Sequence, residues 1–160
     1  MSDHEAPTGA PIPPTPHPTL RELDILEGEW RLEGRDSSGQ PFTGSVTRRW
    51  LDGGFFLTQE TRMDGQPHDG IEYIGYDSAT GMLRSMLFSA EGPGPFCPFA
   101  LEYFWQVEGD NLTIWHGEKG SPALFTGTID RNAATVQGAW EWPGGGYQVD
   151  ATRVPNREDQ

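Results

Sequence analysis

The feature that most constrains this chain is a series of nine short turn signals, which divides residues 29–154 into ten segments. Each signal carries Gly, Asp, Asn or Pro, the residues that supply a positive or a preset φ at low cost. The signals fall at 36–39, 52–54, 64–67, 77–81, 91–95, 109–111, 117–120, 130–132 and 143–146. Gaps of mostly four to six residues are too short for Greek-key crossings, so we expect simple up-and-down connections.

The segments between the turns are rich in aromatic and β-branched residues, which suit a pleated, half-buried surface. The clearest examples are 55–57, 71–76, 101–107, 112–115 and 139–142. Ten short strands in an open sheet would expose two long edges, and closing the sheet removes both edges. We therefore predict an all-β fold, an antiparallel up-and-down barrel of about ten strands, in preference to a sandwich.

The chain before the barrel divides into a tail and a short helix. Residues 1–18 hold six prolines and few large apolar side chains, so we expect a disordered tail, and likewise at 155–160. Thr19, followed three residues later by Glu22, has the pattern of a capping box. Apolar residues follow at helical spacing: Leu20, Leu23 and Leu26. We predict one short helix ending near Gly28, and a barrel domain over 19–154.

Composition excludes several classes of partner and location. Twenty-four acidic and eleven basic residues give a net charge of −13, which repels nucleic acid and anionic membrane surfaces. No apolar run approaches the roughly 18 residues of a membrane span, and residues 1–18 do not resemble a signal peptide. Cys97 is the single cysteine and cannot form an internal disulfide. We expect one soluble cytoplasmic domain.

The start of the first predicted strand resembles a known superfamily. A short helix running into Gly28-Glu29-Trp30 is similar to the Gly-x-Trp start of lipocalin-like (calycin) β-barrels. The resemblance implies that Trp30 closes one end of the barrel and that Arg153, from the last strand, packs over its ring. A guanidinium on an indole face contributes about 0.5–2 kcal/mol. Both residues are therefore expected to be structural.

Two further stretches, 49–56 and 74–81, resemble an uncharacterised bacterial lipocalin-like family of unknown function, and the likeness covers residues 20–154. The chain departs from secreted lipocalins, because it has no Thr-Asp-Tyr type motif and no paired Cys. The link at 36–40 is also too short for the two-helix lid of fatty-acid-binding proteins. The resemblance implies the barrel and names no ligand.

A barrel of this size has room for one small ligand, so the inward-facing residues are the candidate site. Alternation in the first strand places Trp30, Leu32 and Gly34 inward. Elsewhere both faces carry bulk, and period alone does not choose the interior set. Our aromatic candidates are Trp50, Phe56, Tyr73, Trp105 and Trp140, and our polar candidates are Arg48, Glu72 and Glu102. The polar residues could instead be solvent-facing and form cross-strand pairs.

We predict that the barrel binds a small hydrophobic or amphipathic molecule, with no cofactor or metal. One alternative is an isomerase or hydrolase that pairs Glu72 or Glu102 with a tyrosine. Another is a haem carrier resembling nitrobindin, for which His116 is the candidate ligand. A barrel filled by its own side chains is a further alternative. Strands that are apolar on both faces also suggest a homodimer formed across the outer wall.

Overall fold

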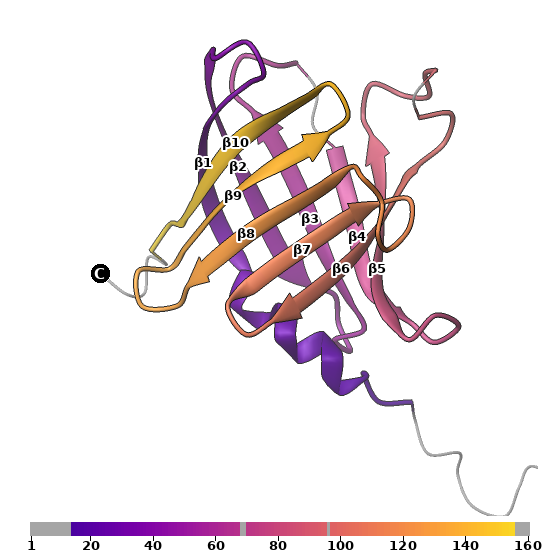
Figure 1. Ribbon diagram of the computed structural model, residues 1–160. Helices are drawn as coiled ribbons and strands as arrows, with labels where there is room; N and C mark the ends of the chain where they lie inside the picture. The colour runs from indigo at the N-terminus through magenta and orange to yellow at the C-terminus, as the bar shows by residue number, and fades with distance from the viewer. Residues whose placement is uncertain (1–13, 68–69, 96, 156–160) are drawn as a thin grey trace, which may run out of the picture.

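The computed structural model describes residues 14–67, 70–95 and 97–155 (Figure 1). Ten antiparallel strands form a closed barrel, in which each strand pairs with its neighbours in sequence and β1 pairs with β10. The strands are β1 (Gly28–Arg35), β2 (Pro41–Trp50), β3 (Phe56–Met63), β4 (Gly70–Asp77), β5 (Met82–Ser89), β6 (Leu101–Glu108), β7 (Asn111–His116), β8 (Leu124–Asp130), β9 (Thr135–Trp142) and β10 (Gly145–Arg153). The predicted all-β, ten-stranded, up-and-down barrel is confirmed, and each predicted turn falls at a connection between consecutive strands.

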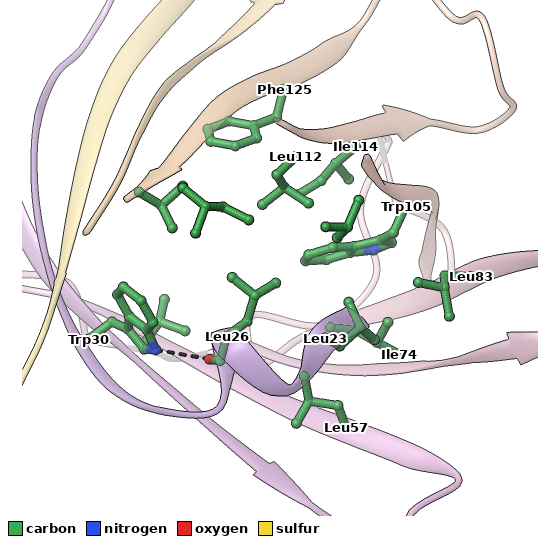
Figure 2. Packing of buried hydrophobic residues seen from close by; sticks show 14 of the residues in the cluster. Leu23, Leu26, Trp30, Leu57, Ile74, Leu83, Trp105, Leu112, Ile114 and Phe125 are labelled. Atoms are coloured by element: carbon green, nitrogen blue, oxygen red, sulfur yellow. Dashed lines mark hydrogen bonds between the residues drawn. The ribbon is translucent and has the colours of Figure 1, made fainter. Parts of the chain in front are cut away.

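The predicted N-terminal helix is present as a 3₁₀-helix, η1 (Pro18–Leu26). Its buried leucines, Leu20, Leu23 and Leu26, recur every third residue. That spacing matches the three residues per turn of a 3₁₀-helix, so the leucines form one stripe. The stripe packs into one end of the barrel, as Figure 2 shows for Leu23 and Leu26. Within the described residues, no helix has the length and apolar character needed to cross a bilayer.

The predicted capping box at Thr19 is wrong. The cap is His17, whose Nδ1 accepts a hydrogen bond from the backbone N–H of Thr19 at 3.2 Å. Pro18 at the first helical position starts the helix earlier than expected, because its fixed φ suits that position. The His17 ring also stacks on Tyr76, with 3.8 Å between ring centroids. Residues 1–13 and 156–160 lie outside the described residues, so the predicted tails and domain limits stay predictions.

The seam between the first and last strands lies at Trp30 and Arg153, which face each other in the β1–β10 register. The guanidinium carbon of Arg153 lies 5.2 Å from the centroid of the Trp30 ring. Trp30 is fully buried, and its Nε1 donates a hydrogen bond to the Leu26 carbonyl at 2.9 Å (Figure 2). This is the arrangement that the lipocalin-like resemblance implies.

The carbonyls at the end of η1 are satisfied by side chains from the barrel. Arg153 Nη2 donates to the carbonyl of Ile25 at 2.8 Å and also to that of Glu27. Arg48 Nη1 donates to the Leu26 carbonyl at 3.3 Å. A helix end buried without such partners would carry unpaired carbonyls, at a cost of about 1–3 kcal/mol each. The same contacts hold η1 against the barrel and close that end.

Glycines let aromatic rings lie against the inner wall of the barrel. A Cβ at Gly34 would lie 2.4 Å from Cζ of Phe42, and a Cβ at Gly138 would lie 2.6 Å from Cζ of Phe125. Gly127 faces Gly138 across β8 and β9, and the Phe125 ring covers both. Larger residues at these positions would displace the rings.

Candidate functional site

The half of the barrel interior next to η1 is filled by apolar side chains. Alternation along each strand brings one buried residue after another to the inner face. The filling residues include Trp30, Val46, Leu57, Ile74, Leu83, Trp105, Leu112, Ile129 and Val136, together with the three leucines of η1. Figure 2 shows several of them packed around Leu23 and Leu26. Any ligand space must therefore lie toward the opposite end, which we call the mouth.

A chain of polar side chains crosses the inner face of five consecutive strands, β2 to β6, with one residue on each strand. Arg48 Nε donates to Oε1 of Gln59 at 2.7 Å, and Gln59 Nε2 donates to Oε1 of Glu72 at 3.2 Å. From the other side, Trp105 Nε1 donates to Ser85 Oγ at 2.8 Å, and the Ser85 hydroxyl donates to Oε2 of Glu72. We call these five residues the interior network, in which both arms donate toward Glu72.

Burial sets the electrostatics of the interior network. Only 5% of Glu72 is exposed, and burial raises the pKa of its carboxyl, although the Ser85 hydrogen bond and the Arg48 charge act in the opposite direction. Burial likewise lowers the pKa of Arg48 to about 10, against the pull of the Glu72 charge. Gln59 lies between the two charges, so they interact through an amide rather than in direct contact.

The raised pKa of Glu72 predicts a specific pH dependence. The folded protein holds the Glu72 proton more tightly than the unfolded chain, whose pKa is near 4.5. The stability contributed by the protonated carboxyl is therefore lost as the pH rises from 4.5 to the raised folded value. The variant Glu72→Gln has no carboxyl to titrate at this position, so its stability does not change with pH for this reason. We expect the free energy of unfolding of the wild type to fall relative to Glu72→Gln as the pH rises from about 4 to about 8 in urea titrations.

Surface aspartates do not interfere with that comparison. The pKa values of Asp36, Asp64 and Asp77 are lowered by hydrogen bonds, first from Ser38, Thr43 and Ala79 respectively. Their contribution is lost only as the pH falls through values below their ordinary 3.8, and the variant shares it. If wild type and Glu72→Gln keep a constant difference across the titration, Glu72 does not have a raised pKa.

Aromatic side chains line the interior between the interior network and the mouth. The ring centroid of Tyr103 lies 5.6 Å from that of Trp140 and 5.4 Å from that of His116. Trp140 in turn lies 5.9 Å from Phe125. Burial first, and the nearby Glu72 charge second, raise the pKa of Tyr103. Tyr103 faces Ser85 in the β5–β6 register, so it lies directly beside the interior network.

At the mouth, a hollow of about 620 Å³ lies between the β1–β2 turn and the β9–β10 hairpin. We call it the rim hollow. Its aromatic lining consists of Trp140, Trp142 and Tyr147, and its polar lining includes Arg35 and Gln148. Trp142 is 40% exposed, and its ring meets Tyr147 edge to face at 5.9 Å. Burial raises the pKa of Tyr147 to about 12.

Four of the predicted lumen residues lie on the inner face. Arg48, Glu72 and Trp105 belong to the interior network, and Trp140 lies between that network and the mouth. Trp50 also packs against the core, but at the η1 end, where the Arg21 guanidinium carbon lies 4.5 Å from its ring centroid. Trp50 is the last residue of β2, and that end of the strand lies beside η1, away from the mouth. Trp50 therefore belongs to the closed end.

The expectation that Phe56 and Tyr73 line the lumen is corrected, because both lie on the outer face. Phe56 is 48% exposed and precedes the fully buried Leu57, so alternation directs it outward. Its ring lies against Gly75, where a Cβ would lie 2.6 Å from Cε1. Tyr73 is 39% exposed between the inward Glu72 and Ile74. Exposed aromatic residues on the outer wall do not test the predicted homodimer, which stays a prediction.

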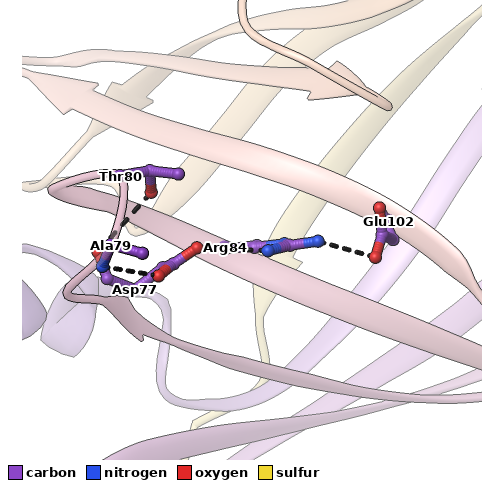
Figure 3. A network of polar contacts seen from close by, with 5 residues as sticks. All are labelled: Asp77, Ala79, Thr80, Arg84 and Glu102. Carbon is purple, nitrogen blue, oxygen red and sulfur yellow. Dashed lines mark hydrogen bonds and ion pairs between the residues drawn. The ribbon is translucent and has the colours of Figure 1, made fainter.

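Glu102 also lies outside the lumen. Its Oε1 accepts a hydrogen bond from Arg84 Nη2 at 2.6 Å, and Arg84 Nη1 contacts Asp77 Oδ2 at 3.1 Å (Figure 3). The Arg84 guanidinium also covers Phe104, at 5.4 Å from the ring centroid. This is the cross-strand pairing that the sequence left open as an alternative. An enzyme that used Glu102 inside the barrel is therefore ruled out by its position.

His116 ends β7 on the inner face at the mouth, where it is exposed. Its ring meets the Tyr103 ring edge to face, with 5.4 Å between the ring centroids. An exposed imidazole at a rim differs from the buried apolar setting in which a single histidine holds haem. The structure therefore adds no support to His116 as a haem ligand.

Sequence reasoning missed several inner-face residues: Gln59, Ser85, Tyr103, Phe125, Trp142 and Tyr147. A signal for two of them was present. Counting by twos from Leu57 reaches Gln59, and counting from Leu83 reaches Ser85. The count needs one inward residue per strand as an anchor, and the sequence supplied one with clear alternation only in β1.

Comparison with known proteins finds a family model that matches part of the chain. Residues 13–89, just under half of the chain, match the family described as "Protein of unknown function (DUF1579)". No curated protein matches the chain. The similarity to lipocalin-like barrels noted in the sequence stays a resemblance.

Two solved structures, both engineered barrels, are similar to this chain. One is a de novo designed fluorescence-activating β-barrel, with 18% identity and a TM-score of 0.43 over 82% of this chain and 96% of that one. The other is a redesigned β-barrel, with 12% identity and a TM-score of 0.43 over 84% of this chain and 96% of that one.

Proposed function

We propose that this protein binds a small apolar or amphipathic molecule at the mouth of its barrel. The observation that carries the proposal is the rim hollow, whose aromatic wall is formed by Trp140, Trp142 and Tyr147. Its volume of about 620 Å³ falls in the range of about 300–1,000 Å³ usual for small-molecule sites. The remaining lining includes Arg35 and Gln148, which face each other in the β1–β10 register and add polar groups to the rim.

The aromatic wall is held in place before any ligand arrives. Trp142 lies across Gly145, where a Cβ would come within 2.7 Å of the indole Nε1, and Tyr147 packs against its edge. Trp140 is fixed between Phe125 and Tyr103. Rings that are already positioned lose little conformational entropy on binding. An exposed but immobilised tryptophan therefore favours a binding surface.

The closed end supports entry from the mouth. Leu20, Leu23 and Leu26 fill the barrel at the η1 end, and Trp30 is fully buried beneath Arg153. The connections alternate between the two ends, which places the β1–β2 turn and the β9–β10 hairpin together at the end away from η1 (Figure 1). The rim hollow is thus at the end that remains accessible.

Binding is tested with N-phenyl-1-naphthylamine, a neutral apolar dye whose fluorescence rises in apolar surroundings. Trp140→Ala and Trp142→Ala should each weaken dye binding roughly tenfold, because each removes an aromatic contact and apolar surface. Trp115→Ala is the matched control. Trp115 follows the inward Ile114 and so faces outward, where Lys119 Nζ lies 6.0 Å from its ring centroid.

The dye experiment contradicts the proposal in two ways. No saturable binding to the wild type would remove the site altogether. Equal affinities for wild type, Trp140→Ala, Trp142→Ala and Trp115→Ala would show that the dye binds somewhere other than the rim hollow. Circular dichroism of each variant verifies that the barrel remains folded.

A further inference from the structure

Glu72 has hydrogen-bonding capacity that the interior network does not use. An ionised carboxylate offers about four acceptor sites. Gln59 Nε2 and the Ser85 hydroxyl each take one, and Trp105, whose Nε1 donates to Ser85 Oγ at 2.8 Å, also acts on the carboxyl as a hydrogen-bond donor, so about one site remains. At 5% exposure of Glu72 this remaining acceptor position lies inside the barrel rather than in bulk water. Buried acceptors of this kind are favourable places for a donor group to bind.

Glu72 is connected to the rim hollow through two aromatic residues. Trp140 lines the hollow, and its ring packs against Tyr103 at 5.6 Å. Tyr103 lies opposite Ser85, the residue that donates to Glu72. Tyr103 is half-buried, and the exposed His116 packs against its ring at 5.4 Å. Trp140 and Tyr103 therefore connect the rim hollow to the interior network.

The hydroxyl of Tyr103 is also available. Among the residues that the structure describes, no hydrogen bond to this hydroxyl is found, and the charge of Glu72 acts on it directly. A phenol can both donate and accept. Glu72 and Tyr103 thus present an acceptor and a second polar group beneath an aromatic wall.

We propose, building on the ligand site at the mouth, that Glu72 and Tyr103 form its polar floor and select ligands with a neutral or cationic N–H or O–H donor over anionic ligands. The positive charge of the interior network is not offered to a ligand. Arg48 donates to Gln59 and to the Leu26 carbonyl, and its guanidinium lies toward Trp30 at the closed end. An anionic head group would meet the Glu72 carboxyl without a facing cation, and like charges repel strongly in a buried site.

The test compares three competitors that share a naphthylmethyl frame and differ in the head group. They are 1-naphthylmethylamine, 1-naphthalenemethanol and 1-naphthaleneacetic acid. Each is used to displace N-phenyl-1-naphthylamine at a pH above the Glu72 transition in the urea titrations, where the carboxyl is ionised. About 0.5 M NaCl screens the general charge of −13 beyond a few ångströms. For the wild type, the amine and the alcohol should displace the dye at roughly tenfold or more lower concentration than the acid.

Glu72→Gln carries the decisive comparison. The substitution keeps the shape of the side chain and removes its charge, so the preference for amine over acid should fall roughly tenfold while the dye still binds. Glu22→Gln makes the same charge change on the exposed side of η1 and should leave the preference intact. Tyr103→Phe keeps the ring and should weaken the alcohol several-fold, which tests the floor independently if Glu72→Gln does not fold.

The outcomes separate this inference from the proposed function. Dye binding that depends on Trp140 and Trp142, with the same amine-to-acid preference in wild type and Glu72→Gln, would overturn the polar floor and leave the mouth site standing. An unchanged alcohol affinity in Tyr103→Phe would overturn the part assigned to Tyr103. Absence of dye binding to the wild type would overturn both proposals together.

Discussion

Trp30→Ala is expected to lower the free energy of unfolding by about 3–5 kcal/mol, the usual cost of truncating a large buried aromatic residue. Trp30 is fully buried at the β1–β10 seam. Its removal leaves a cavity and also deprives the Leu26 carbonyl of the indole donor at 2.9 Å. Arg153 would lose the ring face that its guanidinium covers. The loss is measured by guanidinium chloride unfolding followed by circular dichroism.

Two comparisons show which part of Trp30 matters. Trp30→Phe keeps an aromatic ring and removes the N–H, so it should cost clearly less than Trp30→Ala. Trp142→Ala removes the same side chain from the exposed rim and should cost less than about half as much. If Trp30→Ala were no more destabilising than Trp142→Ala, the indole would not be what holds the seam closed.

The second large effect is expected at Arg48. Arg48→Met should cost roughly 3 kcal/mol, because it leaves Glu72 buried without its charge partner and removes the donor that orients the Gln59 amide. Glu72→Met in turn leaves the Arg48 guanidinium buried without its charge partner, so a similar loss is expected. The double variant removes both charges and should be much more stable than the sum of the single losses predicts, as happens when apolar residues replace a whole buried ion pair.

A double-mutant cycle measures this coupling from the four unfolding free energies. We expect at least about 1 kcal/mol between Arg48 and Glu72, because they belong to one buried network. Arg84 and Glu102 form a matched pair on the outer face, in direct contact at 2.6 Å but open to solvent (Figure 3). Their coupling should not exceed about 1 kcal/mol. Additive losses at Arg48 and Glu72, within about 0.5 kcal/mol, would show that Gln59 does not link them.

The sequence was sufficient to predict the strands and their order because turn chemistry is local. Each break carries its own Gly, Asp, Asn or Pro, and short breaks permit only neighbouring strands to pair. The resemblance of Gly28-Glu29-Trp30 to the start of lipocalin-like barrels also implied the contact between Trp30 and Arg153. The helix type was missed because leucines three residues apart fit both an α-helix and a 3₁₀-helix, and the tertiary packing of the leucine stripe decides between them.

The inner face could not be assigned from the sequence where both faces of a strand are apolar. Phe55-Phe56-Leu57 and Tyr73-Ile74 contain bulk at successive positions, so either register satisfies hydrophobic burial. The choice depends on distant glycines. Gly75 makes room for the Phe56 ring on the outer wall, and this pairing exists only after β3 and β4 align. The interior network was hidden for the same reason, because its members are far apart in the chain.

Both ends of the described chain leave the barrel beside η1. The N–H of Val154 donates to the Glu29 carbonyl, and Pro16 approaches Gly54 in the β2–β3 turn, which also contacts Arg21 of η1. A support attached at Pro16 or Val154 would therefore meet the molecule at its sealed base and leave the rim hollow facing away from the support.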